Sequence, residues 1–432
     1  QSSATWTRQF GSIAGDNVFG AATDASGNTY VVGDPPNSID GQPNSGSNDG
    51  FIGKYDSSGN KLWVRQLGGT GWDTLKGAAA DGSNVYVVGL TYGSIDGQAN
   101  AGNTDAIVAK YDSNGNKVWV REFGASLNDQ LYDAAIDGSG NIYVSGHTDT
   151  SLDGQTNAGF TDALLIKYDS SGNKLWTRLL GTARHDKAEG LAVDASGNAY
   201  IGGWTRDSLD GQPLAGGDDL FVAKYDTNGT KIWVRQNGTA GSDYAFGVGI
   251  DSSNNIYASG YTNDSFDGQS SAGAYDILLT KYDASGNKLW SRQIGGPGND
   301  LNGRVAVNQN GIFVSGYSNG PTFDGQTVSG YADAFLVKYD SSGNKIWTKI
   351  VGTGSDDFGA RVTVDGAGGV YVSGYTGGAF SGQTSAGGYD AFVAKFDGSA
   401  QAKSGVSEQL ANIAAAIAKL AEVIKKLLGI VD

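Results

Sequence analysis

Short runs of strand-forming residues, separated by polar turns, follow one another along almost the whole chain. After Trp233, four such runs occupy residues 246–251, 255–261, 276–283 and 287–294. Gly, Asn and Asp bound each run, as is usual where a chain turns between strands. The pattern predicts four short β-strands in each stretch of about 57 residues.

This four-strand unit recurs seven times. Its marker tryptophans lie 57, 56, 57, 57, 57 and 57 residues apart, and the phrase KYDSSGNK occurs verbatim at residues 54–61, 167–174 and 338–345. A fixed period of this length is typical of architectures in which similar units pack side by side. The seven marker tryptophans are Trp6, Trp63, Trp119, Trp176, Trp233, Trp290 and Trp347.

The repeats predict an all-β fold, a seven-bladed β-propeller of four-stranded antiparallel blades. D-x-x-G-N turns such as residues 24–28 join strands as hairpins, because Asp bonds back to the backbone and Gly accepts a positive φ. The first strand of each unit is rich in Gly and Ala, which suits crowding at an axis. An isolated strand around Trp6 precedes the first unit, and the last unit lacks its fourth strand. We therefore expect the N-terminal strand to close the seventh blade of a propeller spanning residues 1–397.

The composition changes abruptly after Asp397. Residues 398–405 are expected to form a linker, and residues 406–432 an amphipathic helix with a heptad seam. Such an apolar face needs a partner. Self-association, docking to another protein or a neighbouring propeller, and an appended oligomerisation module all remain open, whereas the weakly basic polar face argues against a membrane surface. The seam consists of Val406, Leu410, Ile413, Ile417, Leu420, Ile424, Leu427 and Val431.

The repeat unit resembles the bacterial seven-bladed β-propeller (SBBP) repeat. It reads W-x-R-Q-x-G, then D-x-x-G-N-x-Y-V-x-G, then S-x-D-G-Q, then D-A-F-V-A-K-Y-D-S-S-G-N-K, and it covers residues 4–397. The resemblance implies the propeller fold and a secreted or cell-surface protein. It implies no particular ligand, since members of the family mostly lack an assigned activity.

Charge and composition narrow the classes of function. The net charge of −15 disfavours nucleic acid as a partner. The absence of Cys excludes disulfides and thiolate chemistry. Because the sequence starts at Gln1 and contains no Met, we expect that a secretory signal peptide has been removed. The sequence contains no run of 18 consecutive apolar residues, which is about the length that would span a bilayer.

Aromatic residues that differ between repeats are the candidate ligand site. They lie at the end of the second strand of each unit, or in the loop that enters the first strand, and these two positions define the top face of the expected propeller. Aromatic faces beside polar groups suit a glycan ligand, although packing between blades would use the same residues. The candidates are Trp72, His147, His185, Trp204, Tyr261, Tyr317 and Tyr375.

Aspartates also recur in the expected top loops. Asp16, Asp40 and Asp49 represent the three repeated positions, and such oxygen-rich loops could bind Ca²⁺. The competing interpretation is that these side chains stabilise turns, which a repeating scaffold needs in every copy. No other cofactor is indicated.

Catalysis has little support in the sequence. There are only two histidines and no Cys, and no Ser lies in a G-x-S-x-G motif. We therefore expect no enzyme activity, but a secreted or cell-surface structural subunit or multivalent binding head, assembled or attached through its C-terminal helix. The alternative is a polysaccharide-active hydrolase or lyase that uses carboxylates of the top face.

Overall fold

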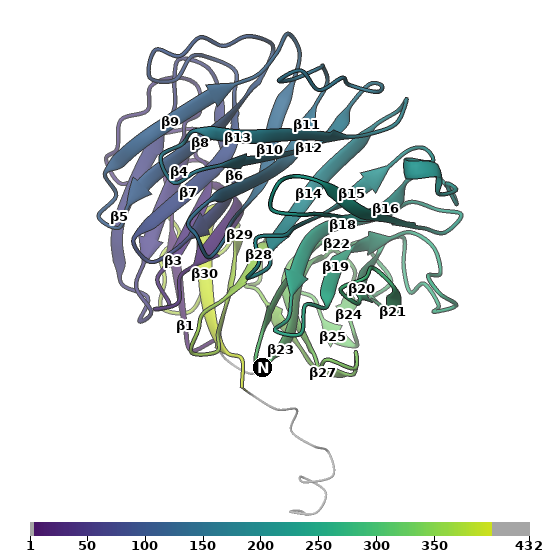
Figure 1. Ribbon diagram of the computed structural model, residues 1–432. Helices are drawn as coiled ribbons and strands as arrows, with labels where there is room; N and C mark the ends of the chain where they lie inside the picture. Colours follow the sequence, from purple (N-terminus) through teal and green to yellow (C-terminus); the bar gives the residue numbers. More distant parts are fainter. Residues whose placement is uncertain (1–3, 400–432) are drawn as a thin grey trace, which may run out of the picture. The chain divides into compact units, whose positions relative to one another are not determined.

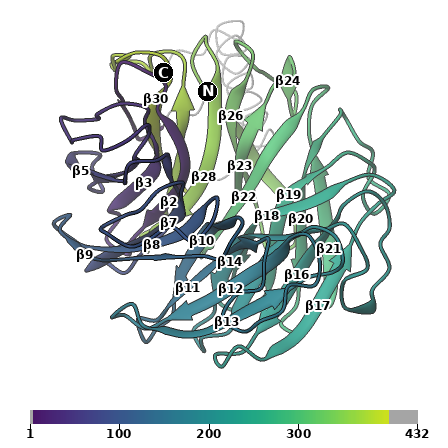
Figure 2. The same cartoon turned by 90° about the horizontal axis from the view of Figure 1, so that it is seen from above.

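The computed structural model describes residues 4–399 and consists of seven four-stranded antiparallel sheets. The chain divides after Gly398 into two units, and the first, residues 1–398, holds all the strands of the described residues. In this unit the sheets follow one another around a common centre, as the blades of a propeller (Figures 1 and 2). The fold predicted from the repeats is confirmed. The expected linker at 398–405 lies almost wholly, and the expected helix at 406–432 entirely, outside the described residues.

The innermost strand of every blade packs against the innermost strands of both neighbouring blades, so these strands surround the axis. They are β2 (Asn17–Thr23), β6 (Asp73–Ala80), β10 (Asp129–Ile136), β14 (Asp186–Val193), β18 (Asp243–Ile250), β22 (Asp300–Asn308) and β28 (Asp357–Val364). Small side chains allow this approach: a Cβ on Gly77 would lie 2.6 Å from the carbonyl oxygen of Tyr132 in the next blade.

The second and third strands of each blade are almost completely buried. The second strands are β3 (Thr29–Asp34), β7 (Asn84–Thr91), β11 (Ile142–Thr148), β15 (Ala199–Thr205), β19 (Ile256–Thr262), β23 (Gly311–Ser318) and β29 (Gly369–Thr376). The third strands are β4 (Gly50–Tyr55), β8 (Asp105–Asp112), β12 (Asp162–Tyr168), β16 (Asp219–Tyr225), β20 (Asp276–Tyr282), β26 (Asp333–Tyr339) and β30 (Asp390–Asp397).

The outermost strands are amphipathic, and one of them comes from the other end of the propeller sequence. They are β5 (Lys61–Leu67), β9 (Lys117–Phe123), β13 (Lys174–Leu180), β17 (Lys231–Asn237), β21 (Lys288–Ile294), β27 (Lys345–Val351) and β1 (Trp6–Phe10). Strand β1 pairs with β30, with Trp6 opposite Lys395 and Phe10 opposite Ala391. The N-terminal strand therefore completes the seventh blade, as predicted. Smaller elements are the 3-10 helix Leu209–Gly211 and the short strands β24 (Thr322–Phe323) and β25 (Gln326–Thr327).

The hydrophobic core lies between the blades. The described residues form seven apolar clusters, and each combines side chains from two neighbouring blades. One cluster, for example, joins Tyr30 and Ile52 of the first blade to Leu75 and Ile107 of the second. A blade buries its faces only against its neighbours, so the ring is stable as a whole rather than blade by blade. Residues 4–399 include no helix with the length and apolar character needed to cross a bilayer.

Candidate functional site

Each innermost strand contains a β-bulge near its top end. The pairing with the second strand skips one residue in six blades and two in the sixth blade. A bulge places an extra residue in the strand and re-aims its side chain, which is a common device beside binding sites. In sequence order, the skipped residues are Phe19, Lys76, Tyr132, Glu189, Phe246, the pair Asn302 and Gly303, and Ala360.

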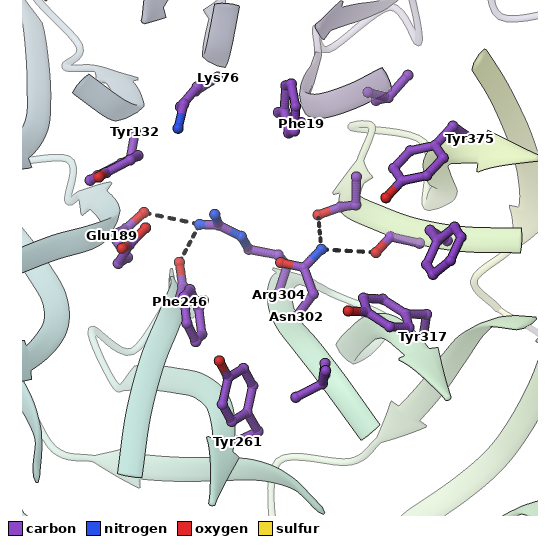
Figure 3. Close-up of a pocket in the computed structure, with 15 residues that line it drawn as sticks. Phe19, Lys76, Tyr132, Glu189, Phe246, Tyr261, Asn302, Arg304, Tyr317 and Tyr375 are labelled. Atoms are coloured by element: carbon purple, nitrogen blue, oxygen red, sulfur yellow. Dashed lines mark hydrogen bonds between the residues drawn. The ribbon is translucent and has the colours of Figure 1, made fainter. Parts of the chain in front are cut away.

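These bulged residues surround a pocket of about 440 Å³ on the propeller axis. Tyr261, Tyr317 and Tyr375, from the second strands of the last three blades, complete one side of it. Figure 3 shows the hydroxyls of these tyrosines directed toward the interior, together with the ammonium group of Lys76. The volume is within the range of small-molecule sites.

The residue after the bulge varies less between blades than the bulged residue itself. It is Gly in four blades, but Asp133, Arg304 and Arg361 occupy it in the third, sixth and seventh. Arg361 Nη2 lies 2.5 Å from Asp133 Oδ1, so a buried ion pair joins blades three and seven across the axis. Asp133 Oδ2 also accepts a hydrogen bond from the backbone N–H of Leu191 at 3.1 Å. The pocket therefore has a charged floor.

Arg304 extends across this floor (Figure 3). Its Nη1 donates to the carbonyl oxygen of Glu189 at 2.9 Å and to that of Phe246. Its Nε is buried and has no hydrogen-bond partner in the part of the chain that the structure describes. Burial, followed by the neighbouring guanidinium of Arg361, lowers the pKa of Arg304 to about 10, so the side chain still carries its charge at neutral pH.

Two further charged side chains line the pocket. The Lys76 ammonium lies 5.0 Å from the ring centre of Tyr132 and 5.9 Å from that of Phe19, as in cation–π contacts. Burial lowers the pKa of Lys76. Burial raises the pKa of Glu189, although Arg304 and other nearby cations oppose the change. The pocket lining thus holds two cations and one carboxylate, in a protein of net charge −15.

Of the rim residues predicted from the sequence, the structure brings Tyr261, Tyr317 and Tyr375 into the pocket. His147 is buried behind it and stacks on Tyr132 with ring centres 5.4 Å apart. Burial lowers the pKa of His147 well below its ordinary value, so this histidine is neutral.

The other three predicted rim residues are not part of the pocket lining. Trp204 packs edge-on against Tyr244 of the next blade at 5.9 Å, as in the competing interpretation. Trp72 is 48% exposed, and its indole N–H donates to Asp34 at 3.1 Å. His185 Nδ1 lies 2.9 Å from the Thr161 hydroxyl.

Sequence reasoning missed the bulged residues and Arg304. The sequence does contain a signal of the bulged residues. The residue three positions after the Asp that begins or precedes each innermost strand differs between neighbouring blades. The second part of the signal is the replacement of Gly at the following position in three blades.

The recurring aspartates form buried pairs at the junctions between blades. In each junction the first Asp of a third strand meets an Asp at the start of the next blade's innermost strand. A Gly between them is required, since a Cβ on Gly68 would lie 2.3 Å from Asp49 Oδ1 and 2.7 Å from Asp73 Oδ2. The seven pairs are Asp49 with Asp73, Asp105 with Asp129, Asp162 with Asp186, Asp219 with Asp243, Asp276 with Asp300, Asp333 with Asp357, and Asp390 with Asp16.

Backbone N–H groups bind one oxygen of each carboxyl, for example Ser45 N to Asp49 Oδ2 and Gly69 N to Asp73 Oδ2, both at 2.8 Å. The Oδ1 atom of all fourteen residues is buried and has no hydrogen-bond partner among the described residues. Burial raises the pKa of Asp300 and of Asp333 to about 7, with the partner carboxyl adding to the effect. One shared proton in such a pair relieves the repulsion between the carboxylates.

The three residues expected as calcium ligands are not brought together. Asp16 meets Asp390 and Asp49 meets Asp73, whereas Asp40 forms a half-exposed ion pair with Lys61 at 2.7 Å. The reason is the turn that holds Asp40 at φ 55°, beside the outer strand. Within residues 4–399 there is no group of three or more His, Cys, Asp or Glu side chains arranged to hold a metal ion.

Four segments of the chain match the family model of the SBBP beta-propeller repeat, at residues 118–153, 175–209, 232–267 and 346–380. Each segment begins in an outermost strand and continues through the first two strands of the next blade. The match thus follows the repeat that builds the ring.

Regulatory protein FlaEY of Caulobacter vibrioides is 26% identical over 400 residues, covering 79% of this chain and 40% of that protein. The uncharacterized WD repeat-containing protein L264 of Acanthamoeba polyphaga mimivirus is 22% identical over 367 residues, covering 64% and 26%. The chain thus spans less than half of either relative. The Pan2 WD40 domain of Neurospora crassa aligns with a TM-score of 0.48 at 10% identity, over 88% of this chain and 89% of that one.

Proposed function

We propose that this chain, which belongs to the SBBP beta-propeller repeat family, is a non-catalytic binding protein whose ligand site is the axial pocket. The observation that carries the proposal is the ring of bulged residues. The scaffold around them repeats almost unchanged, whereas these positions differ from blade to blade and face one cavity. Because packing of the ring does not fix the residue type at these positions, their side chains are available for ligand binding.

A sugar is the class of ligand that the pocket suits best. Tyr261, Tyr317 and Tyr375 combine aromatic faces with hydroxyls, and Asn302 and Glu189 add polar groups. Sugars present both apolar ring faces and hydroxyl groups, so this combination complements them. The Asn302 side chain is anchored by its amide, which donates to the carbonyl oxygen of Gly359 at 2.8 Å.

The proposed setting is a secreted or cell-surface protein that assembles or attaches through residues 406–432. The support is the heptad seam and the resemblance to surface proteins, and several heads on one assembly would strengthen weak binding through multivalency. Sizing the protein with and without residues 399–432 tests this part. We expect an oligomer that becomes a monomer on truncation, and an unchanged mass would contradict self-association.

A regulatory rather than catalytic role is in keeping with the name of the Caulobacter relative, Regulatory protein FlaEY. The polysaccharide-active enzyme would need two carboxylates open to one site. Glu189 is the one carboxylate in the pocket lining, and the paired aspartates are buried at the blade junctions. The binding protein is therefore the better-supported proposal.

Screening a panel of oligosaccharides tests the proposal. The variant Tyr261→Phe, Tyr317→Phe, Tyr375→Phe keeps the rings but removes three hydroxyls from the pocket. We expect it to bind its best glycan about tenfold more weakly or worse, since each hydrogen bond contributes about 1 kcal/mol. Tyr92→Phe, at an exposed tyrosine outside the pocket lining, is the matched control. Equal binding by all three proteins, or turnover of the glycan, would contradict the proposal.

A further inference from the structure

Arg304 has unused hydrogen-bonding capacity at the floor of the pocket. The side chain is only 8% exposed. Its Nη1 is fixed by two backbone carbonyls, but its Nε has no partner, and Nη2 makes no hydrogen bond to any of the described residues. An unsatisfied buried donor is costly, and a charged one more so. Unlike Nε, Nη2 is not fully enclosed, so it is the donor that remains for an anionic group such as a carboxylate.

Lys76 supplies a second unpaired cation on the opposite side of the pocket. No carboxylate of the described residues lies within ion-pair distance of its ammonium, which instead lies near the rings of Tyr132 and Phe19. Figure 3 shows Lys76 and Arg304 both directed toward the space between them. The two cations repel each other, and an anion placed between them would be attracted by both.

The formal charges of the side chains that line the pocket favour a ligand with one negative charge. Arg361 and Asp133 cancel each other in their ion pair below the pocket. Lys76 and Arg304 against Glu189 leave a net charge of one positive unit in the lining. Because the chain as a whole carries −15, this local excess is opposed by the rest of the molecule, and a single negative charge on the ligand would neutralise it.

We propose that the ligand is a carboxylated sugar, such as a uronic acid residue of an acidic polysaccharide. This inference rests on the proposed function and names its ligand class. The carboxylate lies against Arg304 and Lys76, the ring packs on the tyrosines of the last three blades, and Glu189 accepts a hydrogen bond from a sugar hydroxyl. A polysaccharide chain and a free uronic acid offer the same group, so both are compared in the test.

The test uses the full chain and a set of matched probes. Trigalacturonate, its methyl ester, galactose 6-sulfate oligomers of the same length, and free galacturonate are titrated calorimetrically at two salt concentrations. We expect trigalacturonate to bind at least about tenfold more tightly than its ester, because a charged hydrogen bond is worth more than a neutral one. Binding of the free acid would show that one residue is sufficient. Preferential binding of the sulfated oligomer would replace the carboxylate with a sulfate and overturn the proposal.

Two variants assign the effect to the pocket. Lys76→Gln removes one charge and breaks no side-chain hydrogen bond among the described residues, and Arg304→Lys keeps a cation but loses the guanidinium. Each is expected to weaken trigalacturonate binding about tenfold or more while leaving binding of the ester nearly unchanged. The control is Lys224→Gln, which removes the same charge from β16, where the ammonium lies 5.2 Å from the ring centre of Tyr200 and outside the pocket lining. Thermal melting checks that each variant is folded.

The outcomes separate the two proposals. Equal binding of acid and ester, weakened alike by loss of the three tyrosine hydroxyls, overturns the carboxylate proposal and leaves the pocket as a sugar site. Binding that responds to neither the tyrosines nor Lys76 overturns both.

Discussion

The outermost strands and the innermost strands of the propeller both occur once in each blade. Contacts repeat with the same residue types at the outer edge, whereas the residue types of the inner ring change between blades. At the outer edge, Arg65 Nε donates to the carbonyl oxygen of Gly115 in the next blade at 2.8 Å, and its guanidinium lies 5.5 Å from the ring centre of Trp63. The same Arg-to-Gly bond occurs at six junctions, with distances of 2.6–3.1 Å. We call each such Trp and Arg pair, with the Gly it bonds, a clasp. In the inner ring, the bulged residue changes from blade to blade.

The contrast shows which constraint acts at each position. A clasp connects a blade to the turn of its neighbour, so the ring needs the same residues at each junction. The bulged side chains face the cavity instead, and the ring closes whether they are Phe, Lys, Tyr or Glu. Repetition therefore marks the scaffold, and local variation marks the candidate site.

One junction departs from the pattern for a topological reason. Strand β30 of the seventh blade is not followed by a turn into its fourth strand, since β1 supplies that strand. The sixth blade therefore has Lys349 where the others have Arg, and its ammonium lies 4.5 Å from the ring centre of Trp347 and 5.0 Å from that of Phe396. Ring closure itself uses an ordinary clasp, because Arg8 Nε donates to the carbonyl oxygen of Gly59 at 2.6 Å.

Removing the closing strand should have the largest effect. Deletion of residues 1–10 removes the fourth strand of the seventh blade together with its clasp, and it exposes the edge of β30. We expect a loss of more than about 5 kcal/mol in the free energy of unfolding, with aggregation, since removing one packed Trp alone costs about 3–5 kcal/mol.

Circular dichroism melting curves measure the effect of this deletion. A peptide of residues 1–12 added in trans should restore part of the stability, and deletion of residues 1–3 is the control. An unchanged melting temperature after the longer deletion would show that the outer edge does not hold the ring closed.

A single clasp should matter less, and a bulged residue hardly at all. Arg65→Ala removes charged hydrogen bonds to the next blade and should cost about 1.5–3 kcal/mol. Lys76→Gln should lower the free energy of unfolding by less than about 0.5 kcal/mol, because loss of the cation–π contacts is offset by removal of a buried charge that makes no ion pair within the described residues. Urea unfolding of the two variants gives both values. Equal destabilisation would remove the distinction between scaffold and site.

The buried aspartate pairs should show their effect as a pH dependence of stability. In the folded state burial raises the pKa of Asp300 and of Asp333 from 3.8 to about 7, so these groups keep protons that the unfolded chain has already lost. Their contribution is fully present below about pH 4 and is lost as the pH rises through about 7.

Stability should therefore fall between pH 5 and pH 8. Asp333→Asn should flatten the slope, and its free energy of unfolding relative to the wild type should be about 2–3 kcal/mol higher at pH 8 than at pH 5, because about two pKa units of the shift lie in this interval. Chemical unfolding at both pH values measures this difference. A wild-type stability that rises over the same interval would contradict the shared-proton description of the pairs.

The sequence predicts the scaffold better than the site, and the reason lies in the residues themselves. The spacing of Trp63 and its equivalents reports one contact made again at each clasp, so the blade count and the closing strand follow directly. The sequence also predicts Tyr261, Tyr317 and Tyr375 as site residues, since they lie at the ends of second strands that the repeat pattern predicts. Lys76 is not, because a bulge shifts the strand register by one residue without any change in the local pattern of apolar positions.

The floor of the pocket depends on contacts that no local pattern contains. Asp133 and Arg361 are 228 residues apart and meet only because the ring closes. Arg304 reaches the backbone of blades four and five from blade six. The departures from Gly at these three positions could be seen in the sequence, but the axis on which they converge could not.

The most direct test of the central claim is a crystal structure of the protein with bound trigalacturonate. We predict density for a sugar ring in the axial pocket, with its carboxylate within hydrogen-bonding distance of Arg304 and Lys76. A ligand bound between blades or on the outer strands, with the axial pocket empty at saturating concentration, would contradict the account.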